Sequence, residues 1–156
     1  MSDAERDNAG VIAPPPLIFG GPLALGLLLQ RVWPAPFGPP RFARLLGWPL
    51  LLGGLAGAGW FASTMRRAGT PIEPIEPVTR IVTWGPFRYS RNPAYTSMTA
   101  FYVGLAGVLN TRWPLLFLPA VLLTMRHGVI AREERYLART FGAEYTDYRA
   151  RVRRWL

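Results

Sequence analysis

The stretch LLGWPLLLGGLAGAGWFASTM, residues 45–65, has no charged side chain in 21 residues. About 20 apolar residues in a helix are enough to cross the hydrocarbon core of a bilayer. Small residues that let two helices pack closely recur within it, at Gly53, Gly54, Gly57 and Ala58. The stretch therefore predicts a membrane-spanning helix that packs against a second helix.

Three further stretches are nearly free of charge, and the first of them is short and rich in glycine. They predict helices near Pro16–Gln30, Pro93–Thr111 and Trp113–Ile130, and Pro119 is expected to kink the last of these. Half of the 156 residues are hydrophobic. The sequence thus predicts an all-α, multi-pass transmembrane bundle of about four spans.

The arginines predict how this bundle is oriented. With four spans, fourteen of the 18 basic residues fall on the side that holds both termini and the connection between the second and third spans. The other side receives only Arg31, Arg41, Arg44 and Arg112. Because positively charged loops stay in the cytoplasm, both termini and the connection between the second and third spans are predicted to be cytoplasmic.

Composition excludes several classes of function. The chain has no cysteine and one histidine, so disulfides, thiol nucleophiles and a metal site built from these residues are not expected. The net charge is +9, and the arginines flank long uncharged stretches. This pattern favours a membrane partner over nucleic acid. Three regions are predicted: a disordered tail over 1–13, two spans over 14–66, and a functional region over 67–156.

The first polar cluster is GPFRYSRNPAY, residues 85–95, which leads into the third predicted span. Asn92 is expected to cap that helix and Pro93 to be its first residue. Arg88 and Arg91 then lie beside the positive end of the helix, where a carboxylate would be held well. The alternative is that both arginines only anchor the helix at the membrane surface.

The second polar cluster is RHGVIAREERYL, residues 126–137, where the fourth predicted span leaves the bilayer. Helical spacing places His127 and Glu134 on one face and Glu133 on the next. The carboxylates could accept hydrogen bonds from a ribose or hold a cation, and His127 could act as a base near neutral pH. The alternative is a solvated helix end with local ion pairs.

The chain after Gly142 predicts an amphipathic cytoplasmic helix. Its aromatic and apolar residues recur at helical spacing, at Phe141, Tyr145, Tyr148, Val152 and Trp155. Such a helix would lie on the membrane surface or against the other helices.

Two segments carry a resemblance to a known family. TRIVTWGPFRYSRNPAY (79–95), followed after a two-span hairpin by EERYLARTFGAEYTDYRARVRRWL (133–156), resembles the isoprenylcysteine carboxyl methyltransferase and phospholipid methyltransferase group of membrane enzymes. Asn92 stands where the eukaryotic enzymes usually have histidine, and the RNP sequence resembles a bacterial branch. This resemblance implies a location in a bacterial inner membrane. An asparagine cannot titrate, so the resemblance does not imply a proton-accepting role at this position.

The resemblance implies a cofactor and a site. S-adenosylmethionine would bind between the two segments, and a lipophilic acceptor would enter from the bilayer. The implied cofactor-binding residues are Thr79, Arg80, Ile81, Val82, Phe87, Asn92, Pro93, Tyr95, Glu133 and Glu134, with Arg91 in the same motif as Asn92. For a carboxylate acceptor, Arg88 or Arg91 would position the substrate. For an amine acceptor, Glu133, Glu134 or His127 would be the base.

Two other functions remain open from the sequence. A membrane reductase of the sterol-reductase type is similar in its C-terminal region and would use a nicotinamide cofactor. A non-catalytic lipid-binding or scaffold protein would have the same apolar helices, but its polar clusters would tolerate substitution. The hypothesis that we carry forward is methyl transfer to a lipid or isoprenoid-type acceptor.

Overall fold

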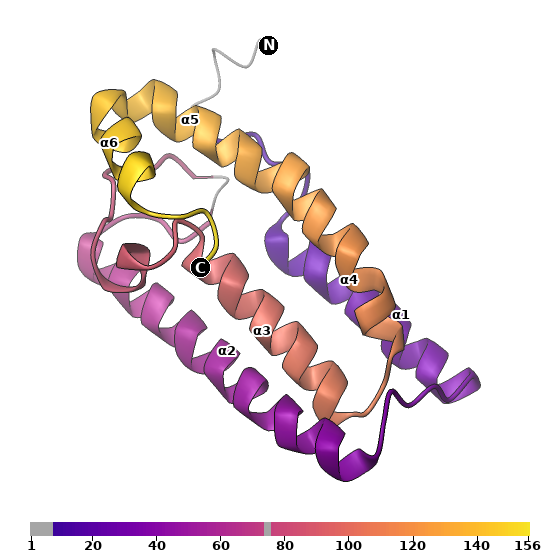
Figure 1. Ribbon diagram of the computed structural model, residues 1–156. Helices are drawn as coiled ribbons and strands as arrows, with labels where there is room; N and C mark the ends of the chain where they lie inside the picture. The colour runs from indigo at the N-terminus through magenta and orange to yellow at the C-terminus, as the bar shows by residue number, and fades with distance from the viewer. Residues whose placement is uncertain (1–7, 74–75) are drawn as a thin grey trace.

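The computed structural model describes residues 8–73 and 76–156. All regular secondary structure in these two ranges is helical, which confirms the predicted fold class. In chain order, the elements are α1 (Pro15–Val32), α2 (Pro40–Ala68), the 3-10 turn η1 (Gly85–Arg88), α3 (Pro93–Val108), α4 (Trp113–Thr124), the π-helical segment η2 (Met125–Ile130), α5 (Ala131–Phe141) and α6 (Ala143–Arg151). Four long helical rods lie side by side (Figure 1), because α4, η2 and α5 join into one.

Three of these rods are long and apolar enough to cross a membrane: α1, α2 and the combined helix Trp113–Phe141. The remaining predicted span, α3, has 16 residues and ends at Val108, which gives a length of about 24 Å against a bilayer core of about 30 Å. Its early end has a local cause, because Asn110 turns the chain with a positive φ of 49°. Helix α3 is therefore a short fourth member of the bundle.

Glycines bring α2 and α3 into backbone contact along their length. A Cβ added at Gly104 would lie 2.2 Å from the Leu51 backbone nitrogen, and one at Gly54 would lie 2.5 Å from that of Phe101. The predicted small-residue face is correct at Gly54, whereas Gly53 faces open space. Since a larger side chain would push the helices apart, these glycines fix the spacing of the pair.

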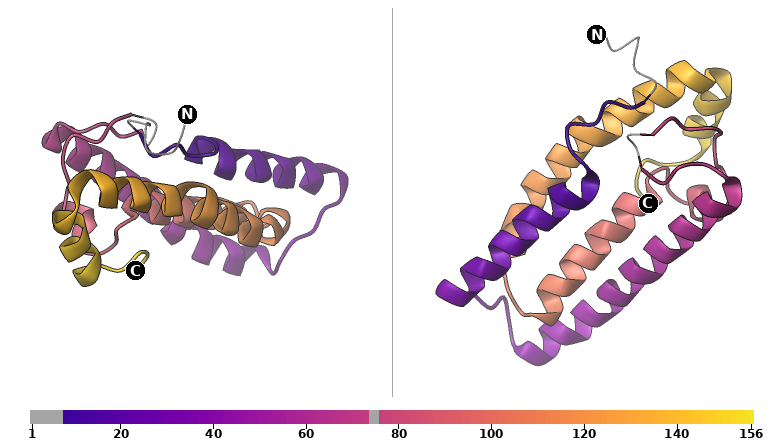
Figure 2. Two further views of the ribbon diagram at one scale, coloured as in Figure 1. Left: turned by 90° about the horizontal axis from the view of Figure 1, so that it is seen from above. Right: turned by 180° about the vertical axis from the view of Figure 1, so that it is seen from behind.

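The other half of the bundle pairs α1 with α4, and α1 also covers one side of the seam between α3 and α4 (Figure 2). Phe19, Tyr102 and Val121 belong to the core that forms there. The Tyr102 hydroxyl donates a hydrogen bond to the Pro114 carbonyl oxygen, 2.8 Å away. The four helices therefore form one unit, whose two short connections, 33–39 and 109–112, meet at the same end (Figure 1).

The C-terminal region differs from the single amphipathic helix predicted for it. Helix α6 stops at Arg151, and Val152 is extended with φ −119° and ψ 133°. The last residues run back to the start of α3 (Figure 1), where the Arg91 backbone N–H donates to the Arg153 carbonyl oxygen at 2.9 Å. Tyr145 and Tyr148 are buried within the protein, so the aromatic stripe packs against other helices.

Part of the predicted disordered tail, residues 1–7, lies outside the described residues. Residues 8–13 make contacts that a disordered tail would not make. The Ile12 backbone N–H donates to the Gly128 carbonyl oxygen at 3.2 Å, and Arg132 donates to the Gly10 carbonyl oxygen at 2.8 Å. This part of the chain therefore packs on the helix that contains η2 and α5.

Candidate active site

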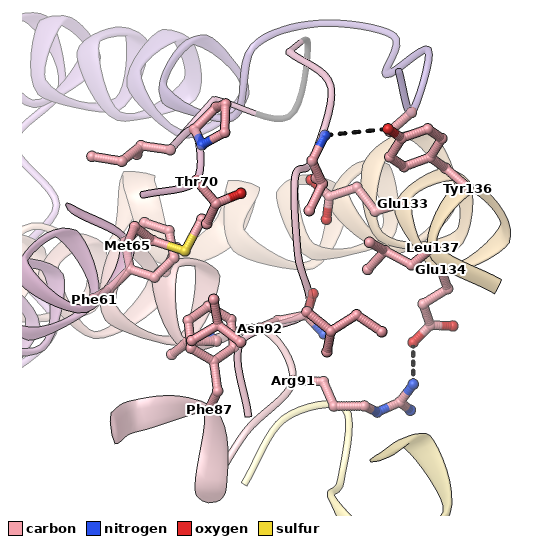
Figure 3. Close-up of a pocket in the computed structure, with 18 of the residues that line it drawn as sticks. Phe61, Met65, Thr70, Phe87, Arg91, Asn92, Glu133, Glu134, Tyr136 and Leu137 are labelled. Atoms are coloured by element: carbon pink, nitrogen blue, oxygen red, sulfur yellow. Dashed lines mark hydrogen bonds and ion pairs between the residues drawn. The ribbon is translucent and has the colours of Figure 1, made fainter. Parts of the chain in front are cut away.

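A cavity lies at the end of the bundle away from the two short connections. Figure 3 shows residues that line it. Its walls come from the end of α2, the segment 70–82, the start of α3, and helices α5 and α6. These elements are far apart in sequence but meet because α2 and α5 both extend past the rest of the bundle (Figure 1). The two polar clusters found in the sequence therefore meet at one site.

Residues of the segment 70–82 are held over the cavity by one hydrogen bond within the segment and one to α5. Gly69 ends α2 in a left-handed conformation with φ 64°, which turns the chain back across the end of the helix. The Thr79 backbone N–H donates to Thr70 Oγ1 at 3.3 Å, and that of Val78 donates to the Tyr136 hydroxyl at 3.2 Å. These bonds hold the described residues of the segment over the cavity in a non-helical conformation.

One wall of the cavity is apolar. Met65 and Val82 pack together as a small cluster, and Phe61 and Phe87 pack against it. The rings of Phe61 and Phe87 have centroids 5.8 Å apart and an interplanar angle of 52°. Such a wall suits a flat, weakly polar group such as a nucleobase.

The opposite wall is polar and contains both glutamates of the second cluster. Tyr95 is buried, and its hydroxyl donates a hydrogen bond to Glu133 Oε1 at 2.5 Å. The Glu133 side chain lies among the cavity residues, facing the apolar wall (Figure 3). A carboxylate placed here could accept further hydrogen bonds or stabilise a cation.

Glu134 is the centre of an ion-pair cluster. Arg154 binds it in a two-pronged arrangement, with Nε 2.9 Å from Oε1 and Nη2 2.7 Å from Oε2. Arg91 Nη1 lies 2.9 Å from Glu134 Oε1. Bidentate pairing of this kind is strong and orientationally specific, so Glu134 is held in place by two arginines.

Tyrosines from α6 support this cluster. Arg91 Nη1 also donates to the Tyr145 hydroxyl at 3.4 Å, and the Tyr148 hydroxyl donates to the Phe87 carbonyl oxygen at 2.7 Å. Burial and the nearby Glu134 charge raise the pKa of Tyr145 above its usual value. Hydrogen bonding to Glu134 raises the pKa of the Arg154 guanidinium, so both groups stay protonated in the physiological range.

Most of the site residues implied by the resemblance line this cavity. They are Arg80, Ile81, Val82, Phe87, Arg91, Asn92, Pro93, Tyr95, Glu133 and Glu134. Pro93 is the first residue of α3 as predicted, but Asn92 does not cap the helix with its side chain. Its Nδ2 instead donates to the Arg154 carbonyl oxygen at 2.8 Å.

Thr79, Arg88 and His127 are not among the described residues that line the cavity. Thr79 Oγ1 donates to the Gly69 carbonyl oxygen, and Arg88 and His127 are exposed. The predicted alignment of His127 with Glu134 assumed an uninterrupted α-helix. The π-helical segment Met125–Ile130 adds an extra residue to a turn, which changes the register between His127 and the glutamates.

Sequence reasoning missed several residues that help to build the site. Phe61 and Met65 were assigned only to a membrane span, and Tyr145 only to an amphipathic face. Tyr136 and Arg154 bind cavity elements far away in sequence. The aromatic periodicity after Gly142 was the available signal, since it marked residues that pack against a partner surface.

A second depression lies on the outer side of the bundle, on the side of the α3–α4 seam that α1 does not cover. It is lined by Leu50, Thr96, Thr99, Ala100, Val103, Leu122, Leu123, Arg126 and Trp155. Its walls are almost entirely apolar, and Arg126 supplies the charged group. Trp155 lines this groove while its neighbour Arg154 binds Glu134 at the cavity.

The fold and the site define a helical membrane protein whose bundle has, at one end, a cavity with one apolar and one polar wall. The sequence model of the phospholipid methyltransferase family matches residues 42–144. The chain therefore belongs to the phospholipid methyltransferase family and is a membrane methyltransferase. Comparisons with curated proteins and with solved structures gave no match.

Proposed function

We propose that the protein transfers a methyl group from S-adenosylmethionine to a lipid-type acceptor. The observation that carries the proposal is the cavity itself, in which an apolar aromatic wall faces Glu133 and Arg91 at one end of a membrane-type bundle. Membership of the methyltransferase family supports the reaction type.

The residues present fit the cofactor. Phe61, Met65 and Phe87 would pack against the adenine, and the Glu133 carboxylate would face the ribose hydroxyls or the sulfonium cation. Among the described residues, the buried Nε of Arg91 has no hydrogen-bond partner. This N–H group is available for a carboxylate such as that of the methionine portion.

The chemistry asks little of the protein beyond positioning. S-adenosylmethionine, when bound, supplies a methyl group on a positively charged sulfur that is already reactive toward a nucleophile. The cavity residues would hold the acceptor in line and exclude water. A carboxylate acceptor needs no base, whereas an amine acceptor must lose a proton, and Glu133 is then the best-placed carboxylate.

We also propose that the acceptor reaches the cavity along the groove between α3 and α4. The groove is apolar, lies on the outer side of a bundle of membrane-type helices, and has Arg126 and Trp155 in its lining. An acyl or prenyl chain would lie along Ala100, Val103 and Leu122. Arg126 would attract an anionic head group at the interface.

The proposed orientation keeps the cavity, both termini and the segment 70–82 in the cytoplasm. It is supported by the arginine distribution, because the cavity end carries most of the 18 basic residues. A bacterial inner membrane would then give the site direct access to cytoplasmic S-adenosylmethionine.

The test is methyl transfer by purified protein in lipid nanodiscs supplied with methyl-labelled S-adenosylmethionine. We expect label in the lipid extract that depends on active protein, and mass spectrometry of that extract identifies the acceptor. The nanodiscs are made with total lipid extract from the source membranes. If these lipids gain no label and the purified protein binds a nicotinamide cofactor, the result would instead support a reductase. Variants in both polar clusters that behave like wild type would support a scaffold.

A further inference from the structure

The last five residues, 152–156, make contacts that a membrane-surface tail would not need. The Ser90 hydroxyl donates to the Arg154 carbonyl oxygen at 3.3 Å, as Asn92 Nδ2 does at 2.8 Å. The Arg91 backbone N–H bonds to the Arg153 carbonyl oxygen. Three consecutive residues immediately before α3 thus hold the backbone of this segment.

The side chain of Arg154 then meets Glu134, and this contact sets the charge of the cluster. Arg91, Glu134 and Arg154 together carry two positive charges and one negative charge. Arg154 takes both oxygens of Glu134, while Arg91 reaches only Oε1. One positive charge is therefore left over, on a side chain that lines the cavity.

Arg91 is placed to use that charge. Its side chain is only 10% exposed, and its Nε is buried with no hydrogen-bond partner among the described residues. A buried donor without an acceptor is costly, and an anionic ligand group would satisfy it. Without Arg154, Arg91 would be neutralised by Glu134, and the anion would lose its partner.

We propose that the C-terminal segment completes the cofactor site from outside the cavity lining and that Arg154 is a positioning residue. By neutralising Glu134, Arg154 leaves the charge of Arg91 available to bind the carboxylate of the amino-acid portion of the cofactor. This inference rests on the proposed function. It assigns Glu134 to the ion-pair cluster and not to direct contact with the ribose.

The test compares two ligands by calorimetry on purified full-length protein. S-adenosylhomocysteine has the carboxylate, and 5′-methylthioadenosine lacks the amino-acid portion. We expect Arg154→Gln to weaken S-adenosylhomocysteine binding by about tenfold and to change methylthioadenosine binding by less than about twofold. Arg154→Lys should lose less affinity for S-adenosylhomocysteine than Arg154→Gln. Arg151→Gln removes an exposed arginine outside the segment, and it should bind both ligands as wild type does.

A charge-restoring double variant separates positioning from general damage to the fold. Arg154→Gln combined with Glu134→Gln leaves Arg91 unneutralised, so binding of S-adenosylhomocysteine should return to within about threefold of wild type. Equal losses for both ligands, no loss in Arg154→Gln, or no recovery in the double variant would overturn the inference. If wild type binds neither ligand, the proposed function fails as well.

Discussion

The hydroxyl of Tyr95 and the carboxylate of Glu133 form a hydrogen bond that joins α3 to α5 at the cavity. The two residues are 38 positions apart in sequence, and each belongs to a different polar cluster. Tyr95 is buried, so the bond fixes where the carboxylate points. The orientation of Glu133 thus depends on α3.

Tyr95→Phe should weaken cofactor binding while preserving the ring that packs in the core. Removing the hydroxyl leaves the Glu133 carboxylate without its donor, and a hydrogen bond to a charged group contributes about 1.5–3 kcal/mol. We expect S-adenosylmethionine to bind at least about tenfold more weakly in equilibrium dialysis. Tyr89→Phe is the matched control, because Tyr89 is 63% exposed, and an equal effect there would argue against the assignment.

Glu133→Gln should reduce binding of a cationic cofactor, since it removes the negative charge and keeps the shape. We expect the Kd for S-adenosylmethionine to rise by about tenfold or more. The control Glu144→Gln, at an exposed position in the first turn of α6, should leave this Kd unchanged.

The kcat of Glu133→Gln at saturating cofactor distinguishes a carboxylate acceptor from an amine acceptor. A preserved kcat favours a carboxylate acceptor, and a kcat lost at all cofactor concentrations favours an amine acceptor with Glu133 as base.

Gly104→Ala should destabilise the helix bundle. The added Cβ would lie 2.2 Å from the backbone nitrogen of Leu51, so α2 and α3 must separate, at a cost of about 1–3 kcal/mol. We expect a lower Tm in detergent. Gly53→Ala, whose Cβ meets nothing within 4 Å, should leave the Tm unchanged or raise it, and a matching fall in both variants would disprove the close contact.

Val103→Trp should obstruct the groove between α3 and α4. A bulky ring there occupies the space proposed for the acceptor chain, so the KM for the lipid should rise several-fold with the cofactor Kd unchanged. Leu116→Trp adds the same ring at a position that is already 60% exposed and outside the groove. If Val103→Trp and Leu116→Trp have the same KM for the lipid, the acceptor does not enter through this groove.

The helices were predictable because their signal is local. Uncharged stretches and the Asn92–Pro93 start are visible in the sequence, and they located all four rods to within a few residues at most ends. The early end of α3 was not visible, since it depends on the positive φ of Asn110. Helix α2 was also underestimated, because it continues from Pro40 to Ala68 through arginines on both sides of its apolar centre.

The sequence predicted only those site residues that belong to recognisable motifs. The resemblance indicated residues of both clusters, but it did not indicate which contacts they make. The π-helical segment changes the register between His127 and Glu133, and no residue pattern in Met125–Ile130 predicts a π-helix there. The pairing of Arg154 with Glu134 depends on the chain reversing after Arg151, which a helical periodicity cannot predict.

The central claim is that one cavity, at the end of the bundle with Arg91 and Glu134, binds S-adenosylmethionine. The most direct measurement is ultraviolet crosslinking of radiolabelled S-adenosylmethionine to the purified protein, followed by peptide mapping. We predict label in peptides that contain Phe61–Tyr95 or Glu133–Tyr148, and competition by unlabelled S-adenosylhomocysteine. Competable label confined to the connections 33–39 and 109–112, at the opposite end of the bundle, would contradict the account.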